Sequence, residues 1–374
     1  MPTEKPLLFT LWQRQVPPSL DAAGWRQLLG RLRRAKLLAR LAVLARERGW
    51  LDGLPEGVRV ELRNAEKRVE RRRLDTLWEG DRLVAALAPV GVPVVMLKGA
   101  AYVVAGERAA IGRDFSDIDI LLPRDRLRDC ETKLMAAGWA AKALDPYDDR
   151  YYRDWMHELP PMQHVQRMTH LDVHHTLTPP TSRWAIDIGR VRAACRPCEH
   201  LPGLLVPAPA DLVIHSAVHL MSEGSFDAAL RDLLDLSDLL GQHGAEPGFW
   251  DALLQRAGEL GLTLPLHDAL VLAAEFAGAP VPPSVQASLH QLHGRGPMRR
   301  AVIALLRHAV LQPGLAQAGW LDGPVGLALY IRSHWLRMPL HQLLPHLLRK
   351  AWLRLRLRLG SAPPAGPPGL RAIR

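Results

Sequence analysis

The chain has 374 residues, of which 48% are hydrophobic and 23% are charged. This composition excludes a globally disordered chain, a collagen-like chain and a short disulfide scaffold, and the length corresponds to about two or three domains. Three cysteines are too few for a disulfide framework, and no run of about 18 uncharged apolar residues is present. We therefore expect a cytoplasmic protein without a transmembrane segment.

The net charge of +10 is concentrated at one end of the chain. Residues 290–374 contain 13 Lys or Arg side chains and one acid, whereas residues 1–289 contain 35 basic and 37 acidic side chains. Any anionic partner that this charge attracts is therefore expected at the C-terminal end.

Residues 1–88 are expected to form an N-terminal helical segment. Leucines between Leu28 and Leu44 recur largely at three- and four-residue spacing, and residues 58–87 carry acidic and basic side chains at helical distances. Proline and glycine in residues 89–93 end this segment.

The pattern changes over residues 89–180, which are expected to form an α+β core: a small mixed sheet with helices. Residues 92–97 (VPVVML) and 117–122 (DIDILL) are typical of buried strands, residues 124–137 are helical in character, and residues 171–177 (LDVHHTL) alternate again. Alternating strands and helices within about 90 residues predict an α/β arrangement at this point of the chain.

The remaining chain is expected to be mostly helical. Residues 181–209 are predicted to be a loop-rich linker, residues 210–359 a C-terminal helical region that is basic at its end, and residues 360–374 a disordered tail.

The basic end, residues 346–359 (HLLRKAWLRLRLRL), is open to two interpretations. A helix would spread its arginines around the circumference, whereas a strand would place Arg354, Arg356 and Arg358 on one face. Nucleic acid and an anionic membrane surface are alternative partners for this end, and a solvated helix that binds neither is the third possibility.

The sharpest chemical pattern is a pair of acids on a predicted strand. Asp117 and Asp119 are two residues apart, so their carboxylates project from one face while Ile118 and Ile120 project into the core. Neighbouring carboxylates raise each other's pKa unless a cation lies between them, and oxygen ligands suit Mg²⁺. A surface turn with two solvated acids is the alternative for this pattern.

Further polar residues fit the same chemistry. Asp172 lies in the later predicted strand and shares a face with His174, so it completes a carboxylate triad around two metal ions if the two strands are adjacent. Gly99 allows close approach to the backbone, the helix start that follows offers free N–H groups to phosphates, and Lys98 adds a positive charge.

Together these motifs resemble an uncharacterised bacterial nucleotidyltransferase family of the DNA polymerase β-like superfold. The resemblance covers roughly residues 92–178 and extends more weakly into the C-terminal helices. It is carried by Leu97-Lys98-Gly99, Arg113, Ser116-Asp117-Ile118-Asp119 and Asp172-Val173-His174, and by His215, His219 and Arg231-Asp232 in the helical part. The Gly-Ser or Gly-Gly pair that is usual in the wider superfold is Gly99-Ala100 here.

The resemblance implies Mg²⁺-dependent transfer of a nucleoside monophosphate from an NTP to an unidentified hydroxyl or phosphate acceptor, with release of pyrophosphate. It implies that Asp117 and Asp119 bind two Mg²⁺ ions, and that Asp172 binds the ion that activates the acceptor. The implied nucleotide-binding residues are Lys98, Gly99, Arg113 and Ser116, and the possible substrate contacts are His174, His215, His219, Arg231 and Asp232. A non-catalytic module that senses a nucleotide or binds a partner is the alternative function.

Two other patterns have competing interpretations. His215 and His219 have the spacing of a zinc-binding pair, but Ser216 stands where the H-E-x-x-H motif requires glutamate, so substrate contact and helix packing are the other roles. Cys195 and Cys198 have CxxC spacing without a second pair, and we expect two loop cysteines rather than a zinc site. A third stretch, which contains His157, His164 and His170, either lines an acceptor pocket or forms a surface excursion.

Overall fold

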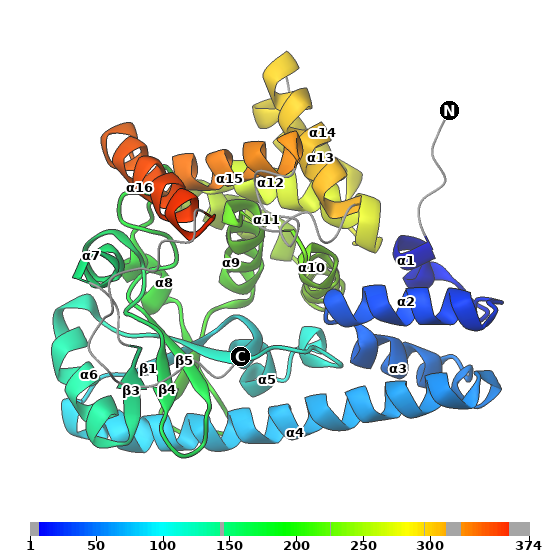
Figure 1. Cartoon of the computed structure of the whole chain (residues 1–374), viewed down its shortest axis with the longest axis horizontal. Coiled ribbons are helices and arrows are strands. Elements are labelled where there is room, and N and C mark those ends of the chain that lie inside the picture. The colour runs from blue at the N-terminus through cyan, green and yellow to red at the C-terminus, as the bar shows by residue number, and fades with distance from the viewer. Residues whose placement is uncertain (1–6, 143–145, 225, 295, 312–322, 359–374) are drawn as a thin grey trace.

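The computed structural model describes residues 7–142, 146–224, 226–294, 296–311 and 323–358. Within them a seven-stranded mixed sheet has the strand order β3-β4-β5-β2-β1-β7-β6. In the view of Figure 1 the long helix α4 (Glu56–Leu87) spans the lower side of the molecule, and most helices after residue 209 lie above the sheet. The predicted α+β class, a sheet flanked by N-terminal and C-terminal helices, is confirmed.

The centre of the sheet is formed by the three strands that the sequence predicts. They are β1 (Val94–Leu97), β2 (Asp117–Leu121) and β5 (His170–His174). β2 pairs antiparallel with β1 and parallel with β5, and this register places Asp119 beside Asp172. The strands run through the core because their apolar residues are buried on both sides, as in β1, where all four residues are buried.

The sheet extends further than the sequence predicts. On one side lie β4 (Met162–His164) and β3 (Trp139–Ala141), and on the other lie β7 (Leu204–Val206) and β6 (Arg196–Pro197). The last two, with helix α8 (Ile188–Ala193), come from residues 181–209, which were expected to be a loop-rich linker. Strands of two or three residues are too short for a period-2 alternation to be read from sequence.

The described residues before β1 form a largely helical segment. It contains α1 (Leu7–Thr10), α2 (Ala22–Arg34), α3 (Leu38–Glu47) and α4. The Asp21 side chain caps α2 by accepting a hydrogen bond of 2.7 Å from the Gly24 N–H.

Helices also follow the first strands and make up most of the described residues after residue 208. The former are α5 (Lys98–Ala105), α6 (Leu127–Ala136) and α7 (Pro146–Arg150). The latter are α9 (Pro209–Ser222), α10 (Ala229–His243), α11 (Phe249–Glu259), α12 (Thr263–Leu272), α13 (Pro283–His293), α14 (Pro297–Leu311), α15 (Pro324–Arg337) and α16 (Leu340–Arg358).

The backbone of the basic end is helical to Arg358, so the strand interpretation is wrong. The side chains of Arg354 and Arg356 lie outside those that the structure describes, as does the side chain of Arg358, and the predicted tail at residues 360–374 also lies outside the described residues.

One hydrophobic core connects these parts. Its buried side chains extend from Leu8 in α1, through Met96 and Ile120 in the sheet, to Leu336 in α15. None of the helices in the described part of the chain combines the length and apolar character needed to cross a bilayer.

Candidate active site

Three aspartates converge at the centre of the sheet. Asp117 and Asp119 project from the same face of β2, and the parallel pairing of β2 with β5 brings Asp172 beside them. One carboxylate oxygen from each of the three lies within 4.8 Å of the others. We call Asp117, Asp119 and Asp172 the aspartate cluster.

The oxygen donors of the aspartate cluster fit a divalent cation. An all-carboxylate set is the ligand chemistry that Mg²⁺ prefers, and negative charges at this spacing repel one another unless a cation is present. The electrostatics agree: burial, reinforced by Asp119 and Glu158 and then by Asp117, raises the pKa of Asp172 to about 7. The cluster could therefore hold the metal that the sequence predicts.

Lys98 supplies a positive charge inside the cluster. Lys98 is the first residue of α5 and has a left-handed backbone with φ of 47°. Its Nζ donates a hydrogen bond of 2.6 Å to Oδ1 of Asp119. Burial would raise the pKa of Asp119, but the Lys98 ammonium and the hydrogen bond with His174 outweigh it and hold that pKa well below its ordinary value. A lysine in this strained conformation is uncommon outside functional sites.

A second group of side chains adjoins the aspartate cluster. His174 is 1% exposed, and its Nε2 lies 2.9 Å from Oδ1 of Asp119 and 3.6 Å from Oε2 of Glu158. Glu158 forms an isolated bridge with His174, and the rings of His157 and His174 lie with centroids 5.1 Å apart. Because of this bridge, the segment before β4 runs antiparallel beside the end of β5 and brings Glu158 close to the cluster.

Glu158 is the residue of this site that the sequence reasoning missed. Its side chain is 19% exposed, and its charge raises the pKa of Asp172. In the sequence, Glu158 is only an acid that follows His157, which is a weak signal of a site residue. The pairing of this segment with β5 is what places Glu158 near the aspartates. Of the three histidines in that stretch, His157 lies at the site, whereas His164 packs edge-on against Trp139 on the outer strands.

Gly99 and Arg113, two of the residues expected to contact the nucleotide, lie against other residues of the protein. A Cβ added to Gly99 would overlap the guanidinium of Arg113 and lie 3.0 Å from the ring of Phe115. Arg113 is 7% exposed and donates from Nε to Asp235 at 2.5 Å. The absence of a side chain at Gly99 thus makes room for Arg113, and the charge of Arg113 is matched by Asp235, so neither observation supports direct contact with a triphosphate.

The other expected contacts lie around the aspartate cluster. The hydroxyl of Ser116 donates to Oδ1 of Asp117 at 3.3 Å. Arg231 pairs with Asp232 at 2.6 Å and donates from Nη1 to the carbonyl of Asp114 at 3.3 Å, which ties α10 to the residues that precede β2. Contact of Ser116, Arg231 and Asp232 with substrate stays a prediction.

The two α9 histidines differ in their surroundings. His215 is 4% exposed, and burial, together with the charges of Lys98 and His174, lowers its pKa to about 3, so it is neutral. His219 lies one turn further on, with Nδ1 3.5 Å from Glu223. Neither belongs to a zinc-type cluster among the residues that the structure describes.

The segment before β2 is anchored by a network of buried charges. Arg40 donates to Asp235 at 2.6 Å, to Asp238 at 2.5 Å and to the carbonyl of Ala109 at 3.1 Å. Because Asp235 also binds Arg113, this single carboxylate joins α3, α10 and the segment that leads to Asp117.

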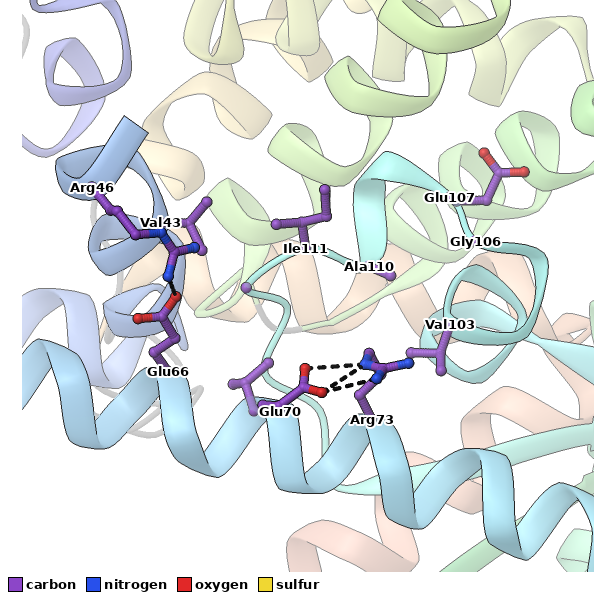
Figure 2. A pocket seen from close by; sticks show the side chains of 12 residues that line it. Val43, Arg46, Glu66, Glu70, Arg73, Val103, Gly106, Glu107, Ala110 and Ile111 are labelled. Carbon is purple, nitrogen blue, oxygen red and sulfur yellow. Dashed lines mark hydrogen bonds and ion pairs between the residues drawn. The ribbon is translucent and has the colours of Figure 1, made fainter. Parts of the chain in front are cut away.

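A cavity of about 280 Å³ lies elsewhere, between α3, α4 and residues 103–112. Figure 2 shows two ion pairs in its wall, Arg46 with Glu66 and Arg73 with Glu70. No residue of the aspartate cluster lines it, so it is separate from the candidate active site.

Comparison with known proteins agrees with this geometry. No curated protein matches the chain. A family described as uncharacterised nucleotidyltransferase matches residues 21–278, which is more than half of the chain and includes α2 to α4, the sheet and α9 to α12. The chain therefore belongs to this nucleotidyltransferase family, as the motifs around Asp117, Asp119 and Asp172 predict.

Proposed function

We propose that the chain transfers a nucleoside monophosphate from an NTP to a hydroxyl or phosphate acceptor and releases pyrophosphate. Family membership supports the general kind of reaction. The observation that supports the finer proposal is the convergence of Asp117, Asp119 and Asp172 within 4.8 Å.

In this proposal the aspartate cluster would hold the divalent cations, expected to be two Mg²⁺ ions. Bound there, they would neutralise charge on the triphosphate during transfer. The protein itself positions the carboxylates and supplies the charged side chains around them. The hydrogen bonds from Lys98 and His174 fix the orientation of the Asp119 carboxylate, and the sheet register fixes Asp172 beside it.

The acceptor oxygen would attack the α-phosphorus, the bond from that phosphorus to the pyrophosphate oxygen would break, and the acceptor would lose a proton. We propose Asp172 as the carboxylate that receives this proton, because the pairing of β2 with β5 places it beside Asp119 in the cluster. Glu158 and His157 lie beside the aspartate cluster, where their segment pairs with the end of β5, and we propose that the acceptor enters there.

The test is incubation of the purified protein with each labelled NTP, Mg²⁺ and cell extract. Labelled acceptor and released pyrophosphate support transfer, and Asp117→Asn and Asp119→Asn should each abolish both while the fold is kept. Full activity in either variant would refute the assignment. Nucleotide binding without turnover under every condition would instead favour a non-catalytic nucleotide-sensing module.

We also propose an anionic partner for the basic end. Helix α16 exposes Leu340, Leu344 and Leu348 at four-residue intervals, with 57%, 59% and 70% of each side chain accessible. Since residues 290–374 hold 13 basic side chains and one acid, an apolar stripe on a basic helix favours an anionic membrane surface over nucleic acid.

Co-sedimentation distinguishes these partners. Vesicles that contain phosphatidylserine should retain the wild-type protein, and a Leu344→Glu, Leu348→Glu variant should be released, while neutral vesicles retain neither. Equal binding of both proteins to an RNA duplex, with no binding to vesicles, would favour nucleic acid.

A further inference from the structure

His157, Glu158 and His174 form a separate group of metal-ligating side chains beside the aspartate cluster. One donor atom from each of the three lies within 4.8 Å of the others. We call these residues the imidazole cluster. Two imidazoles and one carboxylate are a usual ligand set of catalytic zinc sites, whereas the three carboxylates of the aspartate cluster suit Mg²⁺. The two clusters therefore differ in the metal that their donor atoms favour.

The distances in the imidazole cluster are close to those between the ligands of one metal ion. Oε2 of Glu158 lies 3.6 Å from Nε2 of His174 and 4.0 Å from Nε2 of His157. Zinc bonds of about 2.0–2.2 Å at tetrahedral angles place neighbouring donor atoms about 3.4 Å apart. Small shifts of the side chains would therefore let all three residues reach one ion.

Backbone hydrogen bonds hold this segment against the sheet. The N–H of Leu159 donates to the carbonyl of Val173 at 2.8 Å, and the N–H of His175 donates to the carbonyl of His157 at 2.8 Å. The chain is thus paired with β5 on both sides of Glu158. A metal site needs ligands whose positions are fixed before the ion binds, and this pairing fixes them.

The imidazole of His157 has no hydrogen bond that would explain its position. Its Nδ1 is buried without a partner, and its Nε2 has Glu158 only at 4.0 Å, beyond hydrogen-bond distance, within the part of the chain that the structure describes. Nδ1 of His174, a residue that is 1% exposed, is buried without a partner there as well. Buried polar atoms are nearly always paired, so unpaired imidazoles beside a carboxylate point to a ligand that they bind together.

We propose that the imidazole cluster binds a divalent transition metal, with Zn²⁺ as the expected ion. Nε2 of His174 also lies 2.9 Å from Oδ1 of Asp119, so a metal bound through this nitrogen replaces the hydrogen bond to Asp119. Lys98 still holds that carboxylate. Three protein ligands leave the fourth position of the ion to water or to an oxygen of a bound ligand.

Calorimetric titration of the untagged protein with Zn²⁺ tests the site, and the visible absorption of Co²⁺ bound in its place reports the ligands. The wild type should bind Zn²⁺ tightly, and His157→Ala and Glu158→Gln should each weaken this binding about 10- to 100-fold or more, since loss of an outer-shell partner alone costs that much. His170→Gln, which removes an exposed histidine of β5, is the matched control and should bind Zn²⁺ like the wild type. Asp117→Asn should weaken Mg²⁺ binding and leave Zn²⁺ binding unchanged.

The outcomes separate this site from the aspartate cluster. If the wild type binds no Zn²⁺, or if His157→Ala and Glu158→Gln both bind it like the wild type, the inference is wrong. If Asp117→Asn abolishes Zn²⁺ binding while the other two variants keep it, the ion occupies the aspartate cluster, and the inference is again wrong. Nucleotidyl transfer is assayed with Mg²⁺ alone, so a failed Zn²⁺ titration leaves the proposed function standing.

Discussion

Replacing Asp172 by asparagine removes one charge from the aspartate cluster and keeps the shape of the side chain. We expect two opposite effects: loss of nucleotidyl transfer and a gain in stability of the metal-free protein. Both follow from a carboxylate held where its ionised form is costly without a bound cation: burial contributes most to this cost, and repulsion from the neighbouring carboxylates adds to it.

The size of the stability gain can be worked out from the structure. Two charges 4.8 Å apart repel by about 3 kcal/mol at an effective dielectric constant of about 20. The pKa of Asp172, about 7 against an ordinary value of 3.8, corresponds to about 4 kcal/mol. Water at the partly exposed carboxylate relieves part of this cost, so we expect Asp172→Asn to raise the free energy of unfolding by about 2 kcal/mol at pH 8.

The sign of the pH dependence follows from linkage. Because the folded-state pKa of Asp172 is raised, the folded protein binds this proton more tightly than the unfolded chain does. The stability of the wild type therefore falls as the pH rises from about 4 to above 7, and the gain from Asp172→Asn should be small at pH 4 and complete at pH 8.

Urea denaturation of both proteins at pH 5 and pH 8, with and without Mg²⁺, measures these quantities. At ten times its dissociation constant, Mg²⁺ should stabilise the wild type by about 1.4 kcal/mol, and most of this should be lost in Asp172→Asn. The exposed Asp125→Asn serves as the control and should change neither quantity. If Asp172→Asn matches the wild type in stability, in Mg²⁺ response and in activity, the carboxylates do not act together and the reasoning is refuted.

Three further outcomes are expected. Asp235→Ala removes the hydrogen-bonded partner of the buried Arg113, leaves it only the weaker ion pair with Asp232 at 3.9 Å, and should lower the free energy of unfolding in urea by about 3–5 kcal/mol. His243→Gln should cost more stability at pH 6 than at pH 9, because the hydrogen bond with Glu107 raises the pKa of His243 and its stabilisation is lost as the pH rises through that raised value. Gly99→Ala should displace Arg113 and lower the thermal midpoint, with a cost of about 1–3 kcal/mol.

Asp235→Ala and Gly99→Ala each have a matched control on the surface. Asp81→Ala removes an exposed partner of Arg82 and should cost less than about 1 kcal/mol. Gly57→Ala, at an open position near the start of α4, should stabilise the helix rather than destabilise it. Equal effects at the control and test positions would show that the buried network around Asp235 does not anchor the segment before β2.

The sequence determined which local elements form. The apolar run of β1, the alternation around Asp117 and the leucine spacing of the N-terminal helices each depend on residues close together in the chain, so their periods can be read without the fold. The face shared by Asp117 and Asp119 is a local property of the same kind, and it led to the nucleotidyltransferase prediction.

The tertiary structure decided which residues join that pair. Asp172 comes beside Asp119 because β2 and β5 are parallel neighbours, and Glu158 comes near them because its segment pairs antiparallel with the end of β5. No periodic pattern in the sequence encodes these contacts, because each depends on packing between segments far apart in the chain. For the same reason, the partners of Gly99 and Arg113 became visible only in the folded structure.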